Sequence, residues 1–144
     1  MLSRAAVGRT LFSVMMEDHE VLKRELAQCL AGRDVALASF DRFRHHLLWH
    51  VSIEERLLMP ALVKAMRRPP EYAAGLRKDH AGIAALCIPL PEREWVENLR
   101  DLLEEHYRVE EGPGGFYELC RTNIPAEEQA RLVSAIDAFP PLTL

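Results

Sequence analysis

The sequence predicts an all-α fold in which four long helices pack as a bundle and a short additional helix follows at the C-terminal end. Three observations predict it. Apolar residues recur at alternating steps of three and four, no stretch shows the apolar–polar alternation of a strand, and proline or glycine separates the periodic segments. With 144 residues, the chain is expected to form a single domain over residues 1–144, with its core bundle at about residues 11–119.

The first two helices are predicted from the residues at their ends. The first is expected at about residues 11–30, after a few frayed residues, and Gly32 follows it as a natural stop. Asp34 is a residue type favoured at an N-cap, so the second helix is expected to begin there and to continue to about residue 66. Pro60 lies inside this segment and is expected to kink it.

Proline and glycine also delimit the later helices. Two adjacent prolines open the third helix, at about residues 71–87, and Pro89 with a second proline two residues later separates it from the fourth, at about residues 91–111. The Gly-Pro-Gly-Gly run at 112–115 ends the fourth helix. A short fifth helix is expected at about residues 125–139, with proline at its start and two glutamates in its first turn.

Each of the four long helices places one histidine on its apolar stripe, and two of them add a glutamate one turn later. The stripe of the second helix consists of Phe40, Phe43, Leu47, His50, Glu54, Leu57 and Ala61. The other stripes consist of Leu11, Met15, His19, Leu22, Leu26 and Cys29; of Tyr72, Leu76, His80, Ile83 and Cys87; and of Trp95, Leu99, Leu103, His106 and Glu110. Six polar side chains are therefore expected to point into the core.

Bound metal explains why six polar groups would face a dry core. An unpaired carboxylate there costs several kcal/mol, whereas a cation turns imidazole nitrogen and carboxylate oxygen into ligands. A histidine and a glutamate four residues later lie on one helix face, about 6 Å apart along the axis, so the glutamate can lean between two metals. Any one of these residues alone could be a hydrogen-bonded core histidine or a solvated glutamate. The order and register of all six indicate a dinuclear centre.

The composition excludes several kinds of partner. A net charge of −4 without a basic cluster gives no footprint for nucleic acid or for an anionic membrane surface, and no apolar run approaches the roughly 20 residues of a membrane span. The three cysteines, Cys29, Cys87 and Cys120, are widely spaced and form no CxxC pair. This spacing predicts free buried thiols and a cytoplasmic location.

The ordered pattern His19, His50-x-x-x-Glu54, His80, His106-x-x-x-Glu110 resembles that of the hemerythrin-like (HHE cation-binding) domain family. The segments 17–19, 50–60 and 106–111 look like the first, second and fourth motifs of that family. The resemblance covers about residues 11–119. It implies an antiparallel up-down four-helix bundle around a non-haem di-iron centre with an oxo or hydroxo bridge, zinc and manganese being alternative metals.

The resemblance also implies a distribution of ligands. By this likeness, His19 and His50 would bind one iron, and His80 and His106 would bind the other. Glu54 and Glu110 would bridge the two irons. Solvent, an oxo group or O2 would take the remaining positions.

Two features depart from the oxygen-carrying hemerythrins. Those proteins use two histidines four residues apart on the third helix, but Leu76 and Ala84 stand at that spacing from His80. One imidazole is therefore missing, which leaves an extra position for water or for a residue that the sequence does not identify. Because the run at 112–115 follows the last ligand turn, Glu110 is expected to be held less rigidly than Glu54.

Neighbouring polar residues are expected to have outer roles. His46, one turn before His50, is expected to line an entrance or cover the surface rather than reach the metal, and His45 is expected to be exposed. Glu55 and Glu111 are turned about 100° from the ligands that precede them, which predicts solvent contact or hydrogen bonds to ligands.

Three functions fit these features. The first is a binding or sensing module whose centre responds to O2, peroxide, nitric oxide or iron supply and signals by protein contact. The second is a small di-iron oxidoreductase that scavenges peroxide or donates iron for cluster repair, and the open position favours such reactivity. The third is a metal-free bundle that acts only through partner contacts. The sequence identifies neither a protein partner nor an oligomeric state.

Overall fold

The computed structural model describes residues 9–88 and 90–142, and this part of the chain is all-helical. The elements are α2 (Leu11–Cys29), α3 (Leu37–Ile53), a π-helical turn η1 (Glu54–Leu58), α4 (Met59–Met66), α5 (Ala73–Leu86), α6 (Arg93–Glu111), α7 (Phe116–Asn123) and α8 (Ala126–Asp137). The expected frayed start falls mostly on residues 1–8, which lie outside the described residues, as does the expected break at Pro89.

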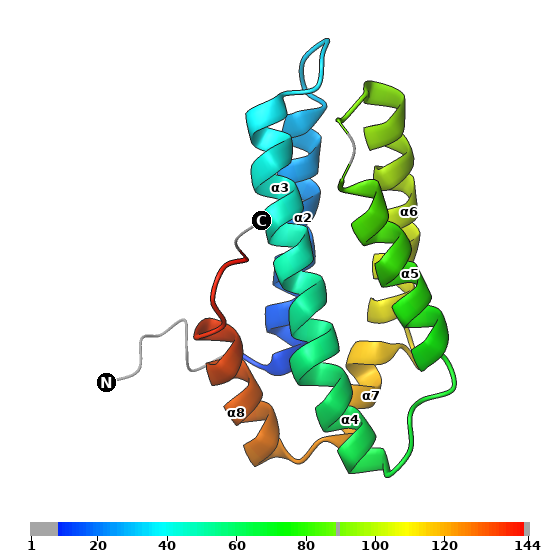
Figure 1. Cartoon of the computed structure of the whole chain (residues 1–144). Coiled ribbons are helices and arrows are strands. Elements are labelled where there is room, and N and C mark those ends of the chain that lie inside the picture. The colour runs from blue at the N-terminus through cyan, green and yellow to red at the C-terminus, as the bar shows by residue number, and fades with distance from the viewer. Residues whose placement is uncertain (1–8, 89, 143–144) are drawn as a thin grey trace.

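The long helices form an antiparallel bundle, as predicted. α2 and α3 lie side by side as one pair, and α5 and α6 form the other pair (Figure 1). The shorter helices gather at the opposite end from the α2–α3 connection, where α7 packs against α2, α4 and α6, and α8 packs against α2. The predicted C-terminal helix corresponds to α8.

The core consists of two apolar clusters, one toward each end of the bundle. The first is built by the C-terminal half of α2, the N-terminal half of α3 and the facing parts of α5 and α6, and it includes Leu22, Phe43, Ile83 and Leu99. The second is built around α4 and α7 and includes Leu11, Met15, Leu58, Leu76 and Phe116. Each of the four histidines on the stripes lies between residues of the first cluster and residues of the second. A polar layer therefore separates the two clusters.

The second long helix changes register directly after Glu54. In η1, the Met59 N–H donates to the carbonyl of Glu54, five residues back instead of four. The extra residue rotates the side chains of the following residues about the helix axis. Pro60, predicted to kink the helix, stands at the start of α4 just after this turn, where its missing N–H interrupts the α-helical bonding.

Because of this register change, the last two positions of the apolar stripe predicted for the second helix are wrong. Leu57 and Ala61 were expected in the core, but they are only partly buried. Leu58 and Leu62, one residue further along, are fully buried instead. A uniform period of 3.6 residues cannot anticipate a π turn.

Two other residues predicted to face the core, and the predicted start of one helix, also differ in the structure. Trp95 was expected in the core but is 37% exposed; Val96 is fully buried in its place, and the Trp95 indole donates to the Leu86 carbonyl at 2.9 Å. Tyr72 is only partly buried. The expected N-cap at Asp34 is wrong, because α3 begins at Leu37, after a bend that contains Asp34.

The Gly-Pro-Gly-Gly turn folds the chain back onto α6 and begins α7, a helix that the sequence analysis did not predict. Gly114 adopts a positive φ of 72°. At Gly115 an added Cβ would collide with the carbonyl oxygens of Val109 and Glu110. Because only glycine permits this close approach, α7 starts against the last turn of α6 and directs Tyr117 into the core.

A Gly115→Ala substitution is expected to destabilise the protein by about 1–3 kcal/mol, because the turn must move away from α6. Gly75→Ala is the matched control. A Cβ at Gly75 meets nothing within 4 Å, and the residue lies inside α5, so this change should raise stability by about 0.5–1 kcal/mol. Thermal unfolding of both variants checks the difference, and equal effects would contradict the close packing of the turn.

Candidate metal centre

One histidine from each long helix and two glutamates meet in the polar layer. They are His19 on α2, His50 on α3, Glu54 at the start of η1, His80 on α5, and His106 and Glu110 on α6. Each is at most 5% exposed. The structure therefore brings together all six residues that the sequence analysis selected.

The six side chains form two groups that share both glutamates. In one group, the Nε2 atoms of His19 and His50 lie 3.1 Å apart. In the other, the Nε2 atoms of His80 and His106 lie 3.2 Å apart. Glu54 and Glu110 belong to both groups, and the four potential ligand atoms of each group lie within 4.8 Å of one another.

Glu110 shows how the sharing works. Its Oε1 lies 3.3 Å from the Nε2 of His19 and also 3.3 Å from the Nε2 of His106, so one carboxylate faces both histidine pairs. Glu54 Oε1 lies 3.3 Å from His80 Nε2 and 3.6 Å from His50 Nε2. Two carboxylates placed between two pairs of imidazoles are suited to bridging two cations.

Several of the converging atoms have no hydrogen-bond partner. Glu54 Oε1 and both carboxylate oxygens of Glu110 are buried and make no hydrogen bond. Leaving such groups without a partner is costly, and a cation would satisfy them. Imidazole nitrogen and carboxylate oxygen together are ligands for iron, zinc and manganese. The residues present therefore fit a pair of bound metal ions.

The crowded charges shift the pKa values of these groups. Burial lowers the pKa of His80, but contacts with Glu110 and Glu54 outweigh it and raise the pKa to about 10. Burial together with the Glu110 charge raises the pKa of Glu54. Burial acts in the same direction on Glu110, but contacts with Glu54 and the histidines hold its pKa well below the ordinary value. The negative charge of the two carboxylates, which raises the pKa of His80, also attracts metal cations.

Comparison with protein families decides the class of this site. The family described as Hemerythrin HHE cation binding domain matches residues 10–112, a span that contains α2 to α6 and all six clustered residues. The chain belongs to this family. No curated protein and no solved structure matched the chain. The four-helix bundle is thus that of a hemerythrin domain, and the buried histidine–glutamate cluster lies within the matched span.

In this hemerythrin domain, an acidic side chain faces the outer nitrogen of each clustered histidine. The Nδ1–H groups of His50, His19 and His80 donate to Asp18 at 2.6 Å, to Glu111 at 2.8 Å and to Glu55 at 2.9 Å, respectively. His106 differs, because Asp79 lies 3.7 Å away and its Nδ1 makes no hydrogen bond. A carboxylate that accepts from Nδ1 fixes the orientation of the ring and leaves Nε2 free to bind metal.

These four acids share a sequence signal. Each is adjacent to one of the six clustered residues, yet each faces a histidine on a different helix. The pairs in sequence are Asp18 with His19, Glu55 with Glu54, Asp79 with His80, and Glu111 with Glu110. Of the two outcomes expected for Glu55 and Glu111, solvent contact or hydrogen bonds to ligands, the structure shows hydrogen bonds. The contact of Asp18 with His50 was missed, although the same adjacency marks it.

An Asp18→Ala substitution is expected to weaken metal binding by about 10–100-fold, because His50 loses the acceptor that orients it. Asp79→Ala is the matched control, since the Asp79 side chain is 56% exposed and 3.7 Å from His106. Titration of the metal-free variants with metal, followed by calorimetry, measures both affinities. Equal losses in the two variants would contradict a specific orienting role for Asp18.

Tyr117, on α7, is a site residue that the sequence analysis missed. Its hydroxyl donates to Glu54 Oε2 at 2.9 Å and lies 2.8 Å from the Nε2 of His19 and 3.2 Å from that of His50. Burial and the charges of Glu110 and Glu54 raise the pKa of Tyr117 well above the ordinary value. No spacing in the sequence marked this residue, because the turn and helix that return it to the centre were not predicted.

His46 and His45 do not place a nitrogen in the cluster. The two ring nitrogens of His46 lie 2.7 Å from carboxylate oxygens of Glu25 and Asp18, and the side chain lines hollows at the surface. Burial opposes protonation of His46, but these carboxylates raise its pKa. His45 was expected to be exposed but is partly buried, with its Nδ1 2.6 Å from the carbonyl oxygen of Asp41.

The two departures noted in the sequence have clear structural counterparts. Leu76 belongs to the apolar cluster around α4 and α7, and alanine at 84 carries no ligand atom, so no second imidazole accompanies His80 on α5. Glu110, expected to be held loosely, is as buried as Glu54, with 1% exposed in each case. The glycine turn packs against its carbonyl, so this end of α6 is enclosed.

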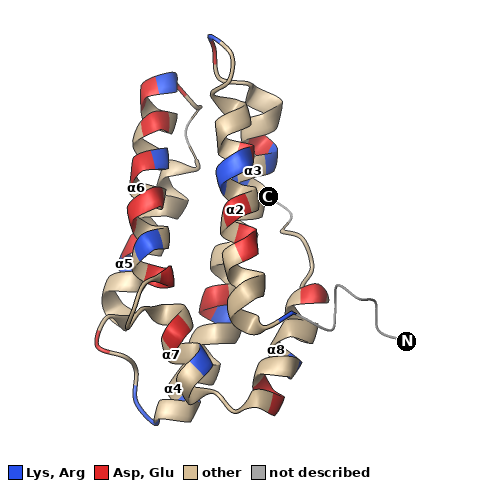
Figure 2. Ribbon diagram, turned by 180° about the vertical axis from the view of Figure 1, so that it is seen from behind, with Lys and Arg blue, Asp and Glu red and all other residues tan. Residues whose placement is uncertain are grey.

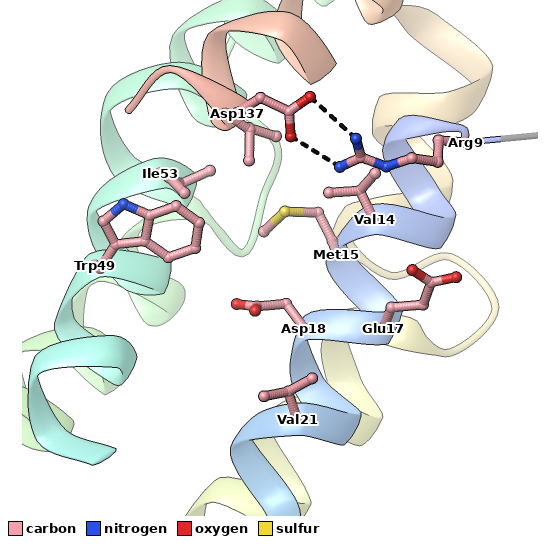
Figure 3. Close-up of a pocket in the computed structure, with 10 residues that line it drawn as sticks. Arg9, Val14, Met15, Glu17, Asp18, Val21, Trp49, Ile53 and Asp137 are labelled. Carbon is pink, nitrogen blue, oxygen red and sulfur yellow. Dashed lines mark hydrogen bonds and ion pairs between the residues drawn. The ribbon is translucent and has the colours of Figure 1, made fainter. Parts of the chain in front are cut away.

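A surface pocket of about 350 Å³ reaches the outer side of the centre beside Asp18. It lies between α2, α3 and α8, its wall is mostly apolar, and an ion pair of 2.9 Å between Arg9 and Asp137 closes one side (Figure 3). Asp18 points into this space in the same view. Since Asp18 also accepts from His50, only one side chain separates this pocket from a candidate ligand.

Charged residues of both signs occur on the described helices (Figure 2). Acidic and basic residues are interspersed along α6 (Figure 2), and none of the described helices is long and apolar enough to cross a membrane. Cys29, Cys87 and Cys120 are buried and free, as expected. The cytoplasmic location stays a prediction.

Proposed function

We propose that the protein is a non-haem di-iron protein whose centre binds or senses a small ligand such as O2, peroxide or nitric oxide. The pair of four-donor groups that share Glu54 and Glu110 carries this proposal. His19 and His50 would hold one iron, His80 and His106 the other, and the two glutamates would bridge them. Bound iron would supply redox-active, Lewis-acidic ions to which such ligands coordinate.

The donor set supports iron over zinc. Structural zinc sites are usually tetrahedral and closed, with cysteine and histidine ligands. Here the two carboxylates are shared between two imidazole pairs, an arrangement that favours iron or manganese. Metal analysis of the purified protein distinguishes the three metals.

The surrounding residues prepare the centre for a small exogenous ligand. Two histidines and two shared carboxylates for each metal leave positions that the side chains of the six residues do not fill. The apolar clusters on both sides of the polar layer keep bulk water out, so that the site favours small molecules over bulky ones. The outer carboxylates keep the imidazoles oriented while such a ligand enters and leaves.

A small di-iron oxidoreductase is the second candidate. The absence of a second histidine on α5, where Leu76 packs in the apolar core, favours it, because a metal with fewer protein ligands has more room for a reacting substrate. Peroxide scavenging and iron donation for cluster repair both belong to this candidate.

Ligand titration of the iron-loaded protein tests the proposal. Azide, nitric oxide and peroxide should each produce a saturable change in the visible spectrum, and the zinc-loaded protein, as the matched control, should show none. If the spectrum of the iron-loaded protein stays unchanged with all three ligands, the binding function is contradicted. Sustained turnover of peroxide would favour the enzyme over the binding protein.

A further inference from the structure

The Tyr117 hydroxyl lies among the ligand atoms of only one of the two histidine pairs. Its oxygen and the Nε2 atoms of His19 and His50 form a triangle with edges of 2.8, 3.2 and 3.1 Å. The side chain is 1% exposed, so the hydroxyl is shielded from bulk solvent.

The three atoms of the triangle have almost no protons to share. In the neutral tautomers that donate Nδ1–H outward, to Glu111 and to Asp18, the rings of His19 and His50 carry lone pairs on both Nε2 atoms. The single phenol hydrogen points to Glu54 Oε2. Three lone-pair atoms therefore face one another at close range in the core, an arrangement that a cation among them would stabilise.

The size of the triangle also matches a coordination sphere. Ligand atoms bound about 2.1 Å from a metal and at right angles to one another lie about 3 Å apart. The three observed edges cluster around this value. The hydroxyl therefore lies where a ligand of the metal held by His19 and His50 belongs.

The geometry points to Tyr117 as a seventh protein ligand, bound through its phenol oxygen to the metal of His19 and His50 and absent from the metal of His80 and His106. This assignment rests on the proposed function, because it places the residue on one iron of the proposed pair. Tyr117 lies beyond residue 112, where the match to the family ends, so the family pattern does not supply it.

When Tyr117 binds the metal, one bond forms and one bond breaks. The metal–oxygen bond forms, the phenol O–H bond breaks, and the proton leaves to bulk water; no electron is transferred. The phenolate adds one negative charge to a centre that already contains two carboxylates, and so it favours the more highly charged, ferric state of the iron that it binds.

The two metals then differ in their capacity for other ligands. The chain has three tyrosines. The hydroxyls of the other two, Tyr72 and Tyr107, make no hydrogen bond. With Tyr117 on one metal, an exogenous ligand such as azide is directed to the metal of His80 and His106. Replacing Tyr117 should open a second position and raise the number of azide ions bound per chain from one to two.

Spectroscopy of Tyr117→Phe, with Tyr107→Phe as the matched control, tests the assignment. Both changes remove one hydroxyl, and the Tyr107 ring stacks on His19 at 4.1 Å between centroids, so both alter a neighbour of the centre. The wild-type protein and Tyr107→Phe should show a phenolate-to-iron charge-transfer band, with phenolate ring modes in the resonance Raman spectrum. Tyr117→Phe should lose both while its iron content stays the same.

Two further measurements keep the test decisive. Ring-deuterated tyrosine in the wild-type protein should shift the Raman modes, which identifies a tyrosine ligand even if a variant fails to fold. Zinc added to the metal-free protein should produce the near-ultraviolet difference spectrum of one phenolate per chain, and Tyr117→Phe should not produce it.

The outcomes separate the two proposals. Equal spectra of wild type and Tyr117→Phe at full iron loading overturn the Tyr117 assignment and leave the di-iron centre standing. If the chain binds zinc but no iron, the proposed function fails, and the near-ultraviolet signal alone decides whether Tyr117 is a ligand. If no cation binds at all, both proposals fail.

Discussion

A His50→Ala variant is expected to be purified with almost no bound metal. His50 supplies one of the two imidazoles of its pair, and the glutamates of that group serve the other pair as well, so both metals should be affected. The loss of affinity should exceed the roughly 10–100-fold that removal of an outer hydrogen-bond partner costs. Metal analysis by mass spectrometry, with circular dichroism to verify the helical content, measures the effect.

His45→Ala is the matched control for this change. His45 lies on the same helix, five residues earlier, and its ring contacts the carbonyl of Asp41 rather than the cluster. This variant should keep the full metal content of the wild-type protein. A His50→Ala protein that retained full metal content would remove His50 from the ligand set.

Removing the metal is expected to lower the melting temperature, and the loss should grow as the pH rises from about 6.5 towards 9. Free cation at 1,000 times its dissociation constant stabilises the folded state by about 4 kcal/mol, which corresponds to a shift on the order of 10–20 °C in a chain of this size. Thermal unfolding with and without chelator measures the shift.

The pH trend follows from His80. In the metal-free protein, the pKa of His80 is raised to about 10, above its unfolded value of about 6.5. The stability from its protonation is therefore complete below about pH 6.5 and is lost as the pH rises through the folded pKa. The loaded protein uses neutral histidine and lacks this loss. A melting difference that stays constant from pH 6.5 to 9 would contradict the raised pKa, and in the metal-free protein His80→Gln should reduce the fall in stability over this range.

Helical periodicity was sufficient to find the six clustered residues. On a helix, residues three and four apart share a face, so a histidine between two buried apolar neighbours must itself face the core. His19 between Met15 and Leu22 is the simplest case, and all three are at most 1% exposed. Where the helix stayed regular, most positions on the stripe could be read directly from the sequence; Trp95, in the first turn of α6, is an exception.

The errors in the second long helix begin where the backbone departs from that regularity. The π turn at Glu54 adds one residue, so Leu58 replaces Leu57 in the core. The spacing of His50 and Glu54 is unaffected, because the turn starts at Glu54. A π turn depends on the packing of both helix ends, and no local residue pattern specifies it.

Tyr117 escaped prediction for a different reason. Its contact with His19 joins residues 98 positions apart, through a glycine turn and a separate short helix. Sequence periodicity is local, and it carries no information about where the chain returns after a turn. The collision that any side chain at Gly115 would cause with α6 sets the direction of that return, and it is evident only in three dimensions.

The central claim is that two iron ions share Glu54 and Glu110. Mössbauer spectroscopy of the protein loaded with ⁵⁷Fe and oxidised in air, combined with iron analysis, tests it most directly. We predict two ferric ions per chain whose spins are coupled through the bridges, so that the spectrum in an applied field is that of a diamagnetic ground state. One iron per chain, or two irons with uncoupled paramagnetic spectra, would contradict the shared centre.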